Sequence, residues 1–308
     1  MTSAHSASSS VLVSDSFTEL RFIYGTAWKK DRTKGLVELA LENGFRAVDT
    51  AAQPRHYQEE EVGRGIRAWL SKRGDGGGVR ERGDIYVQTK YTTPAGQDLN
   101  NMPYDPSEPL ETQIRTSVAS SLRNLRPQED SDENSYLDCV LLHSPLPTIN
   151  QTIQAWKILE TYVPDRIRAL GISNVTLPVL QAIQESSTIK PSVVQNRFYP
   201  QTRYDGPLRA FCREQGISYQ SFWTLTGNPH LLRSEPVSSL AQAANVGTAT
   251  ALYAFVMDLD IMVLNGTTSA NHMREDLDGI RKARDWAIAN GSEWERMRRV
   301  FEHCILPL

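Results

Sequence analysis

Four side chains of the sequence have complementary chemistry: Asp49, Lys90 and His143, each of which follows a short apolar run, and Tyr57, which lies eight residues after Asp49. A lysine beside a buried aspartate forms an ion pair, and a nearby tyrosine then feels the positive charge. That charge favours the phenolate and lowers the tyrosine pKa from about 10 towards neutrality. Such a tyrosine can protonate an oxygen while a hydride reaches the adjacent carbon, and a neutral histidine can orient the carbonyl. The combination therefore predicts proton transfer.

Each of these residues also has a structural explanation when it is taken alone. An aspartate after a strand often caps a helix. A lysine at a strand end is commonly solvated, and a single histidine is more often a core residue than a catalyst. Because Asp49, Lys90 and His143 follow three separate apolar runs, the combination favours the catalytic interpretation.

The elements that must position these side chains alternate regularly along the chain. Short apolar runs, each about the length of a strand buried on both faces, span 21–24, 46–48, 84–88, 137–142, 169–172, 192–194, 217–219 and 261–264. Amphipathic segments that we expect to be helical span 33–43, 59–70, 111–125, 152–162, 177–184, 206–215, 248–257 and 273–288. This alternation predicts an α/β fold, a closed (β/α)8 TIM barrel in a single domain over 17–308. We expect residues 1–16 to be a flexible extension and the C-terminus to be a short tail.

Catalytic residues of such barrels stand at the carboxyl ends of the strands. Polar residues follow most of the predicted strands here, among them Thr26, Asp49, Lys90, His143, Ser173, Asn174, Gln195 and Asn265. Two segments, 91–109 and 223–236, also follow strands, so we expect them to be loops that cover a pocket. Their aromatic residues Tyr91, Tyr104 and Trp223 predict a partly apolar substrate pocket.

Composition excludes several classes of partner. The net charge is −3, so no basic field exists to hold nucleic acid or anionic lipid. No run reaches the ~20 apolar residues of a membrane span, and the N-terminus has no basic region typical of a secretion signal. The three cysteines form no CxxC pair, so neither a disulfide framework nor a metal site is indicated. We expect a cytoplasmic protein with a small-molecule substrate, either a monomer or a weak homo-oligomer.

Seven blocks of the sequence resemble the aldo-keto reductase family, in the branch common in fungi. They occur in the family's order over about 21–288 and comprise Gly25-Thr-Ala-Trp28, Asp49-Thr-Ala51, Tyr57 with Glu60-Glu-Val-Gly63, Gln88-Thr-Lys90, Leu141-Leu-His143, Gly171-Ile-Ser-Asn174 and Gln195-Asn196. The resemblance implies a (β/α)8 barrel that reduces an aldehyde, ketone or ketoester carbonyl with a nicotinamide cofactor.

The resemblance also implies a role for each matched residue. Tyr57 would be the general acid and Lys90 would tune it, while Asp49 would hold Lys90 and His143 would orient the carbonyl. Residues implied at the cofactor are Gly25, Thr26, Asp49, Ser173, Asn174, Gln195, Phe222, Leu225, Gly266, Thr267, Thr268, His272, Glu275 and Asp276. Phe222 stands where the family usually has a tyrosine that stacks under the nicotinamide. Residues implied at the substrate are Trp28, which matches with a one-residue offset, Tyr91 and Trp223.

Two departures from the family pattern bear on function. The stretch from Asp49 to Tyr57 has three extra residues, which we expect Ala52-Gln-Pro54 to absorb as a bulge. A displaced Tyr57 would leave His56 or water facing the carbonyl. At the far end of the cofactor, Gly266 and His272 replace the lysine and arginine that bind the 2'-phosphate of NADP.

The cofactor prediction is therefore NADPH, with NADH left open. Backbone amides of Gly266-Thr-Thr268 begin the last barrel helix and can hold a phosphate, and Arg274 is near enough in sequence to replace the missing arginine. The same three residues are equally consistent with a simple strand-to-helix turn.

Two alternative functions stay open at this point. One is a nucleotide-binding regulatory barrel with little turnover, which the loss of the phosphate-binding residues motivates. The other is a non-redox isomerase or dehydratase that uses Tyr57 and Lys90 as acid and base.

Overall fold

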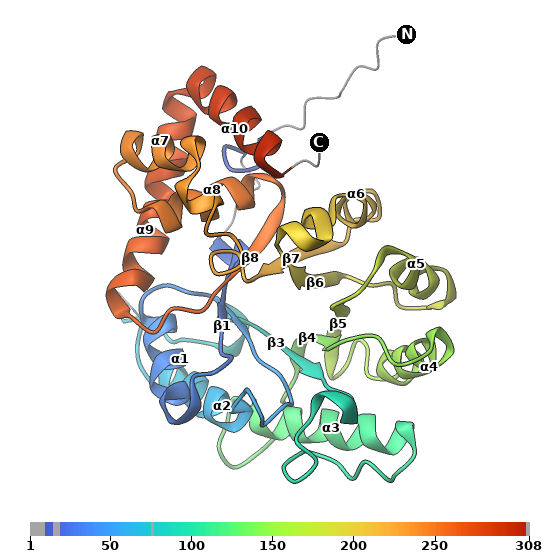
Figure 1. The fold of residues 1–308 in the computed structure, drawn as a ribbon. Helices are drawn as coiled ribbons and strands as arrows, with labels where there is room; N and C mark the ends of the chain where they lie inside the picture. The colour runs from blue at the N-terminus through green and yellow to red at the C-terminus, as the bar shows by residue number, and fades with distance from the viewer. Residues whose placement is uncertain (1–9, 15–18, 75–76, 306–308) are drawn as a thin grey trace.

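The strands of the computed structural model, which describes residues 10–14, 19–74 and 77–305, form one closed sheet. They are β1 (Phe22–Gly25), β2 (Ala47–Asp49), β3 (Tyr86–Tyr91), β4 (Leu137–Leu142), β5 (Ile167–Ser173), β6 (Val193–Arg197), β7 (Ser218–Phe222) and β8 (Ile261–Asn265). All neighbours pair in parallel, and β1 pairs with β8, which closes the barrel (Figure 1). The predicted (β/α)8 barrel is confirmed.

The helices lie around the outside of this barrel (Figure 1). In the described residues they are α1 (Thr33–Glu42), α2 (Glu59–Leu70), α3 (Leu110–Asn124), α4 (Ile149–Glu160), α5 (Leu177–Ser186), α6 (Gly206–Glu214), α7 (Glu235–Ala243), α8 (Thr248–Asp258), α9 (Ala270–Ala289) and α10 (Gly291–Ile305). None of the helices described is long and apolar enough to cross a membrane.

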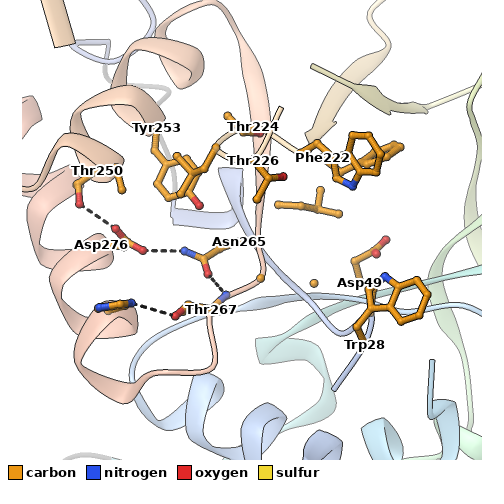
Figure 2. Close-up of a pocket in the computed structure, with 18 of the residues that line it drawn as sticks. Trp28, Asp49, Phe222, Thr224, Thr226, Thr250, Tyr253, Asn265, Thr267 and Asp276 are labelled. Atoms are coloured by element: carbon orange, nitrogen blue, oxygen red, sulfur yellow. Dashed lines mark hydrogen bonds between the residues drawn. The ribbon is translucent and has the colours of Figure 1, made fainter. Parts of the chain in front are cut away.

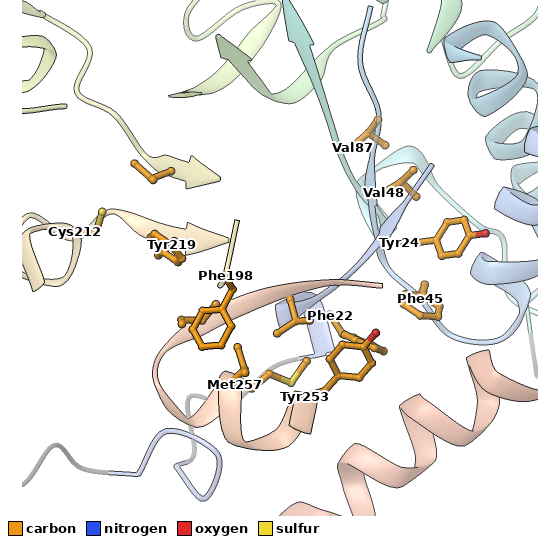
Figure 3. Close-up of a cluster of buried hydrophobic side chains, with 14 of the residues drawn as sticks. Phe22, Tyr24, Phe45, Val48, Val87, Phe198, Cys212, Tyr219, Tyr253 and Met257 are labelled. Atoms are coloured by element: carbon orange, nitrogen blue, oxygen red, sulfur yellow. The ribbon is translucent and has the colours of Figure 1, made fainter. Parts of the chain in front are cut away.

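The core lies between the strands and this outer layer of helices. Every residue of β4 is buried, as expected of a parallel strand covered on both faces. Around β1, the Phe22 ring packs between Phe45 and Tyr253, with centroid separations of 5.2 and 5.1 Å (Figure 3). This packing fixes the start of β1 against α8.

Two helices were not expected from the sequence. Helix α7 begins within the last two residues of the predicted loop at 223–236, and α10 replaces the predicted C-terminal tail. Helix α10 buries Trp294, Met297 and Phe301, whose spacing of three and four residues is that of one helix face. Phe255 of α8 stacks on both Trp294 and Phe301, at 5.0 and 4.7 Å. The apolar spacing was therefore a sequence signal for α10.

The expected flexible N-terminal extension is not what the structure has at residues 10–14. The Asp258 carboxylate accepts hydrogen bonds from the Ser10 hydroxyl at 2.6 Å and from the Leu12 amide at 2.9 Å. Trp294 Nε1 donates to Ser10 Oγ at 3.0 Å, and the Leu12 side chain is fully buried. This segment is anchored to α8 and α10; residues 1–9 and 15–16 of the predicted extension lie outside the described residues.

Candidate active site

A cavity of about 1620 Å³ opens where the strands end and continues along α8 and α9, as far as Tyr253 and Lys282. Of the residues predicted for the site, it is lined by Gly25, Trp28, Asp49, Tyr57, His143, Ser173, Asn174, Gln195, Phe222, Trp223, Leu225, Gly266, Thr267, His272, Glu275 and Asp276. Pockets for drug-sized ligands are typically about 300–1,000 Å³. This cavity is therefore large enough for a dinucleotide together with a small substrate.

Lys90 and Asp49 form a buried ion pair beneath the cavity. Lys90 Nζ donates to both carboxylate oxygens of Asp49 at 2.7 Å and to the Thr50 carbonyl at 2.8 Å. All three ammonium hydrogens are thus engaged. Burial lowers the pKa of Lys90, and the Asp49 carboxylate counteracts this effect. Lys90 supports the site from behind and is not part of the cavity wall.

The three extra residues before Tyr57 form a compact turn that brings Tyr57 to the cavity. The Gln53 carbonyl accepts the backbone N–H groups of both His56 and Tyr57 at 3.0 Å. The Gln53 side chain ties the turn to Gly96 through a 2.5 Å hydrogen bond. Tyr57 lies edge-on to His143 with ring centroids 6.1 Å apart. His56 lines the cavity as well, with its ring on Trp28 at 3.9 Å.

The pKa of Tyr57 differs from the sequence-based expectation. Burial raises it well above its ordinary value of 10, and the Asp49 carboxylate raises it further. Lys90 lies 5.3 Å from the Tyr57 ring centroid, but its charge is largely neutralised by Asp49. The expected lowering by the cation is therefore wrong for this structure, and Tyr57 is a protonated phenol.

His143 follows β4 and is held as a neutral ring. Burial lowers its pKa to about 3, and the charges of Lys90 and His56 add to the effect. Its Nδ1 lies 2.6 Å from the Thr92 hydroxyl. When that hydroxyl donates to Nδ1, the ring proton is on Nε2 and is available as a donor.

Two glutamine side chains bind the Asp49 carboxylate inside the barrel, and a third, Gln220, links them. Gln88 Nε2 and Gln195 Nε2 both donate to Asp49 Oδ1, at 2.6 and 2.9 Å. Both also donate to Gln220 Oε1, at 2.7 and 2.9 Å, and Gln220 Nε2 donates back to Gln88 at 2.9 Å. With its N–H groups committed, Gln195 offers only its oxygen to a ligand in the cavity. The resemblance gave Gln220 no role in the site.

Ser173 and Asn174 are similarly committed as donors. The Ser173 hydroxyl donates to the Gln195 carbonyl at 2.7 Å, and Asn174 Nδ2 donates to the His143 carbonyl at 2.9 Å. Their oxygens are therefore the groups that can meet a ligand. Such acceptors suit the NH2 group of a carboxamide.

The far end of the cavity is built around Asp276 (Figure 2). Its carboxylate accepts from the Thr250 hydroxyl and from Asn265 Nδ2, both at 2.8 Å. Asn265 Oδ1 in turn accepts the Thr267 amide at 2.8 Å, and Thr267 Oγ1 lies 3.5 Å from His272 Nδ1. Asp276 thus uses one carboxylate oxygen to bind α8 and the other to hold the loop at 265–267.

Four predicted site residues do not line the cavity: Thr26, Lys90, Tyr91 and Thr268. Tyr91 was expected in a loop, but β3 extends through it, and successive side chains of a strand point to opposite faces. Tyr91 therefore points outward, stacks on Tyr104 at 5.6 Å, and is 2% exposed. Tyr104 is also buried, so the segment 91–109 contributes no aromatic ring to the cavity.

The structure adds cavity residues that the sequence analysis missed. Lys29 lines the cavity and donates to the Gly266 carbonyl through a short hydrogen bond, and burial lowers its pKa. Arg197 lines the cavity at the end of β6, two residues after Gln195 and thus on the same face of the strand. That alternation was a usable signal for Arg197.

Comparisons with known proteins agree with this architecture. A sequence profile described as the Aldo/keto reductase family matches residues 22–283. The NAD/NADP-dependent indole-3-acetaldehyde reductase of Schizosaccharomyces pombe is 30% identical over 253 residues, which are 79% of this chain and 76% of that protein. The glyoxal reductase of Bacillus subtilis is 26% identical over 243 residues, 79% and 75% of the two chains.

Solved structures share the fold. An aldo-keto reductase from a Medee basin deep-sea metagenome library has a TM-score of 0.67 and 20% identity, and the match covers 91% of this chain and 95% of that one. A Bombyx mori aldo-keto reductase in complex with NADP has a TM-score of 0.66 and 19% identity, with 90% and 92% covered. On the strength of the profile match and the sequence relatives, the chain belongs to the aldo-keto reductase family.

Proposed function

We propose that this protein reduces the carbonyl of a small aldehyde, ketone or ketoester to an alcohol, with NADPH as the hydride donor. One observation carries the proposal. Tyr57 and His143, a protonated phenol and a neutral imidazole, face one cavity, and the Lys90–Asp49 pair lies directly behind them.

The residues present fit a nicotinamide dinucleotide. Phe222 offers a ring face near the strand ends, and the oxygens of Ser173, Asn174 and Gln195 can accept from a carboxamide. At the other end, a side chain added at Gly266 would meet only Lys29 Nζ within 4 Å, at 3.8 Å. The backbone there is therefore open to a phosphate beside a lysine. When bound, the reduced cofactor would supply the hydride.

The protein's own residues would position the carbonyl and provide the proton. The Tyr57 hydroxyl donates a hydrogen bond to the carbonyl oxygen, and His143 Nε2 donates a second one that fixes its direction. As negative charge develops on that oxygen, the Tyr57 proton moves to it. Lys90 lies behind the Tyr57 ring, and Asp49 holds Lys90 in place through two hydrogen bonds.

NADPH is favoured over NADH by the cations of the far end. Lys29, Arg274 and Lys282 line the cavity, and their ammonium and guanidinium groups can bind a phosphate. Relatives use such cofactors: one is named NAD/NADP-dependent, and the Bombyx mori structure holds NADP.

The substitution Tyr57→Phe tests the proposal. It should lower kcat for a carbonyl panel by at least about 100-fold, because the proton donor is lost, while NADPH still binds in a fluorescence titration. Tyr91→Phe is the matched control, since Tyr91 is a buried tyrosine outside the cavity, and it should keep its turnover. Full activity of Tyr57→Phe would overturn the assignment of the proton donor.

A further inference from the structure

Arg197 brings a cation to the catalytic end of the cavity. It is the last residue of β6 and pairs in register with Phe222 of β7. Its guanidinium lies over the Phe222 ring at 5.4 Å and over the Trp223 ring at 4.7 Å, measured to the ring centroids. These two rings hold the planar guanidinium in one orientation beside the reaction centre.

The Arg197 guanidinium has few hydrogen-bond acceptors around it in the described residues. Among the described residues it forms no ion pair with a carboxylate, and its one hydrogen bond is a long one of 3.4 Å from Nη1 to Asn174 Oδ1. Its Nε is buried without a partner. A partly buried arginine with five N–H donors and so few acceptors leaves donors for a ligand.

No free negative charge lies near Arg197 to compensate the charge of its guanidinium. Asp49 is neutralised by Lys90, and His143 is neutral because burial lowers its pKa to about 3. The other acidic residues of the cavity, Glu275, Asp276 and Asp278, lie on α9 at its far end. An arginine fork matches a carboxylate with two parallel hydrogen bonds.

Aromatic rings make up much of the surrounding wall. Trp223 is 53% exposed and Trp28 66% exposed, and both line the cavity. In Figure 2, Asp49 lies between Phe222 and Trp28. An apolar or aromatic body would therefore pack well beside a charged group.

We propose that Arg197 determines substrate specificity by binding a carboxylate, so that the preferred substrates are carbonyl compounds with an apolar body and a carboxylate group. This inference rests on the proposed carbonyl reduction and narrows its substrate class to oxo acids and carboxylated aldehydes.

The test compares acids with their own methyl esters. The pairs are phenylglyoxylate with its methyl ester, and 4-carboxybenzaldehyde with methyl 4-formylbenzoate, so that the carboxylate lies close to or far from the carbonyl. For at least one pair, kcat/KM should be higher for the acid than for the ester. In Arg197→Gln the acid-to-ester ratio should fall about 10- to 100-fold, the range expected for loss of a charged hydrogen bond. Arg197→Lys keeps the positive charge but loses the two parallel N–H donors of the guanidinium, so its acid-to-ester ratio should lie between those of the wild type and Arg197→Gln.

The matched control is Arg203→Gln, which removes the same charge from an exposed arginine outside the cavity and should leave the ratio unchanged. A wild-type protein that prefers both esters would overturn the proposal. So would an Arg197→Gln variant in which acid and ester turnover fall equally while NADPH binding weakens, because Arg197 would then serve the cofactor.

A binding measurement separates this inference from the proposed reaction. Phenylacetate and phenylacetamide, neither of which can be reduced at a ketone or aldehyde, are titrated into the protein–NADPH complex and followed by nicotinamide fluorescence. Tighter binding of phenylacetate that disappears in Arg197→Gln supports a carboxylate site even if no carbonyl is turned over. Equal binding of both compounds overturns the site even if esters are reduced.

Discussion

Lys90 Nζ lies 2.7 Å from both carboxylate oxygens of Asp49, and the whole pair is buried beneath the reaction centre. Two full charges persist there because each satisfies the other and because Gln88 and Gln195 add hydrogen bonds to the same carboxylate. The pair therefore couples the chemistry of the site to the stability of the barrel.

Removing one member of this pair should destabilise the fold. Asp49→Asn leaves the Lys90 cation buried without a counter-charge, which typically costs about 3–5 kcal/mol in the free energy of unfolding. Urea denaturation measures this loss. Asp278→Asn, which breaks a surface ion pair with Arg281, should cost less than about 1 kcal/mol. Similar losses in the two variants would show that the buried pair has no special role.

The rate of reduction should depend little on pH. His143 becomes charged only as the pH falls towards its pKa of about 3, and Tyr57 loses its proton only above its raised pKa. Neither residue changes charge between pH 5.5 and 9 by these shifts, so kcat with saturating NADPH should vary less than about threefold over that range. A steep fall with an apparent pKa between 7 and 9 would mean that the phenol ionises there, as the sequence alone had suggested.

The glutamine network should control cofactor binding through Gln195. Gln220→Leu is similar in size but removes the oxygen that accepts from both Gln88 and Gln195. Gln195 then loses one of its two anchors, and we expect the Kd for NADPH to rise about 5- to 10-fold, with a lower Tm. Gln242→Leu, an exposed position of α7, is the control. An unchanged Kd for NADPH in Gln220→Leu would show that the glutamine network does not affect cofactor binding.

Cofactor preference should respond to charge at the far end of the cavity. His272→Arg adds a permanent cation on the exposed first turn of α9 and should raise the NADPH-to-NADH ratio of kcat/KM about 10-fold. Gly266→Lys fits sterically, since only Lys29 Nζ lies near, but the two like charges should make its gain smaller. If the NADPH-to-NADH ratio of kcat/KM is unchanged in both variants, the 2'-phosphate binds away from His272 and Gly266.

The sequence was most informative about the order of the elements. Most buried parallel strands contain an apolar run, so each of the eight was located in part, but their ends depend on hydrogen bonds to neighbouring strands, and β6 and β7 continue into polar residues beyond the predicted runs. The extension of β3 through Tyr91 is an example: it turns that side chain from the expected pocket into the core. A difference of a few residues at a strand end thus changed the assigned role of an aromatic ring.

In the site as well, the sequence predicted which residues take part but not the properties that depend on their three-dimensional arrangement. Motifs predicted that Tyr57, His143 and Asp49 meet, and the structure brings all three to one cavity. The pKa of Tyr57 could not be predicted in this way. Its direction depends on burial and on how completely Asp49 neutralises Lys90, and both are properties of distances in three dimensions.

The anchored segment at residues 10–14 has a consequence for how the chain folds. Ser10 and Leu12 bind Asp258 across 248 and 246 residues of sequence, and β1 pairs with β8 over a similar separation. Contacts of such long range form slowly, because a large loop must close before they stabilise anything. On the ribosome, residues 10–14 cannot bind Asp258 until α8 has emerged. A segment that is synthesised before the barrel strands is therefore among the last to reach its place.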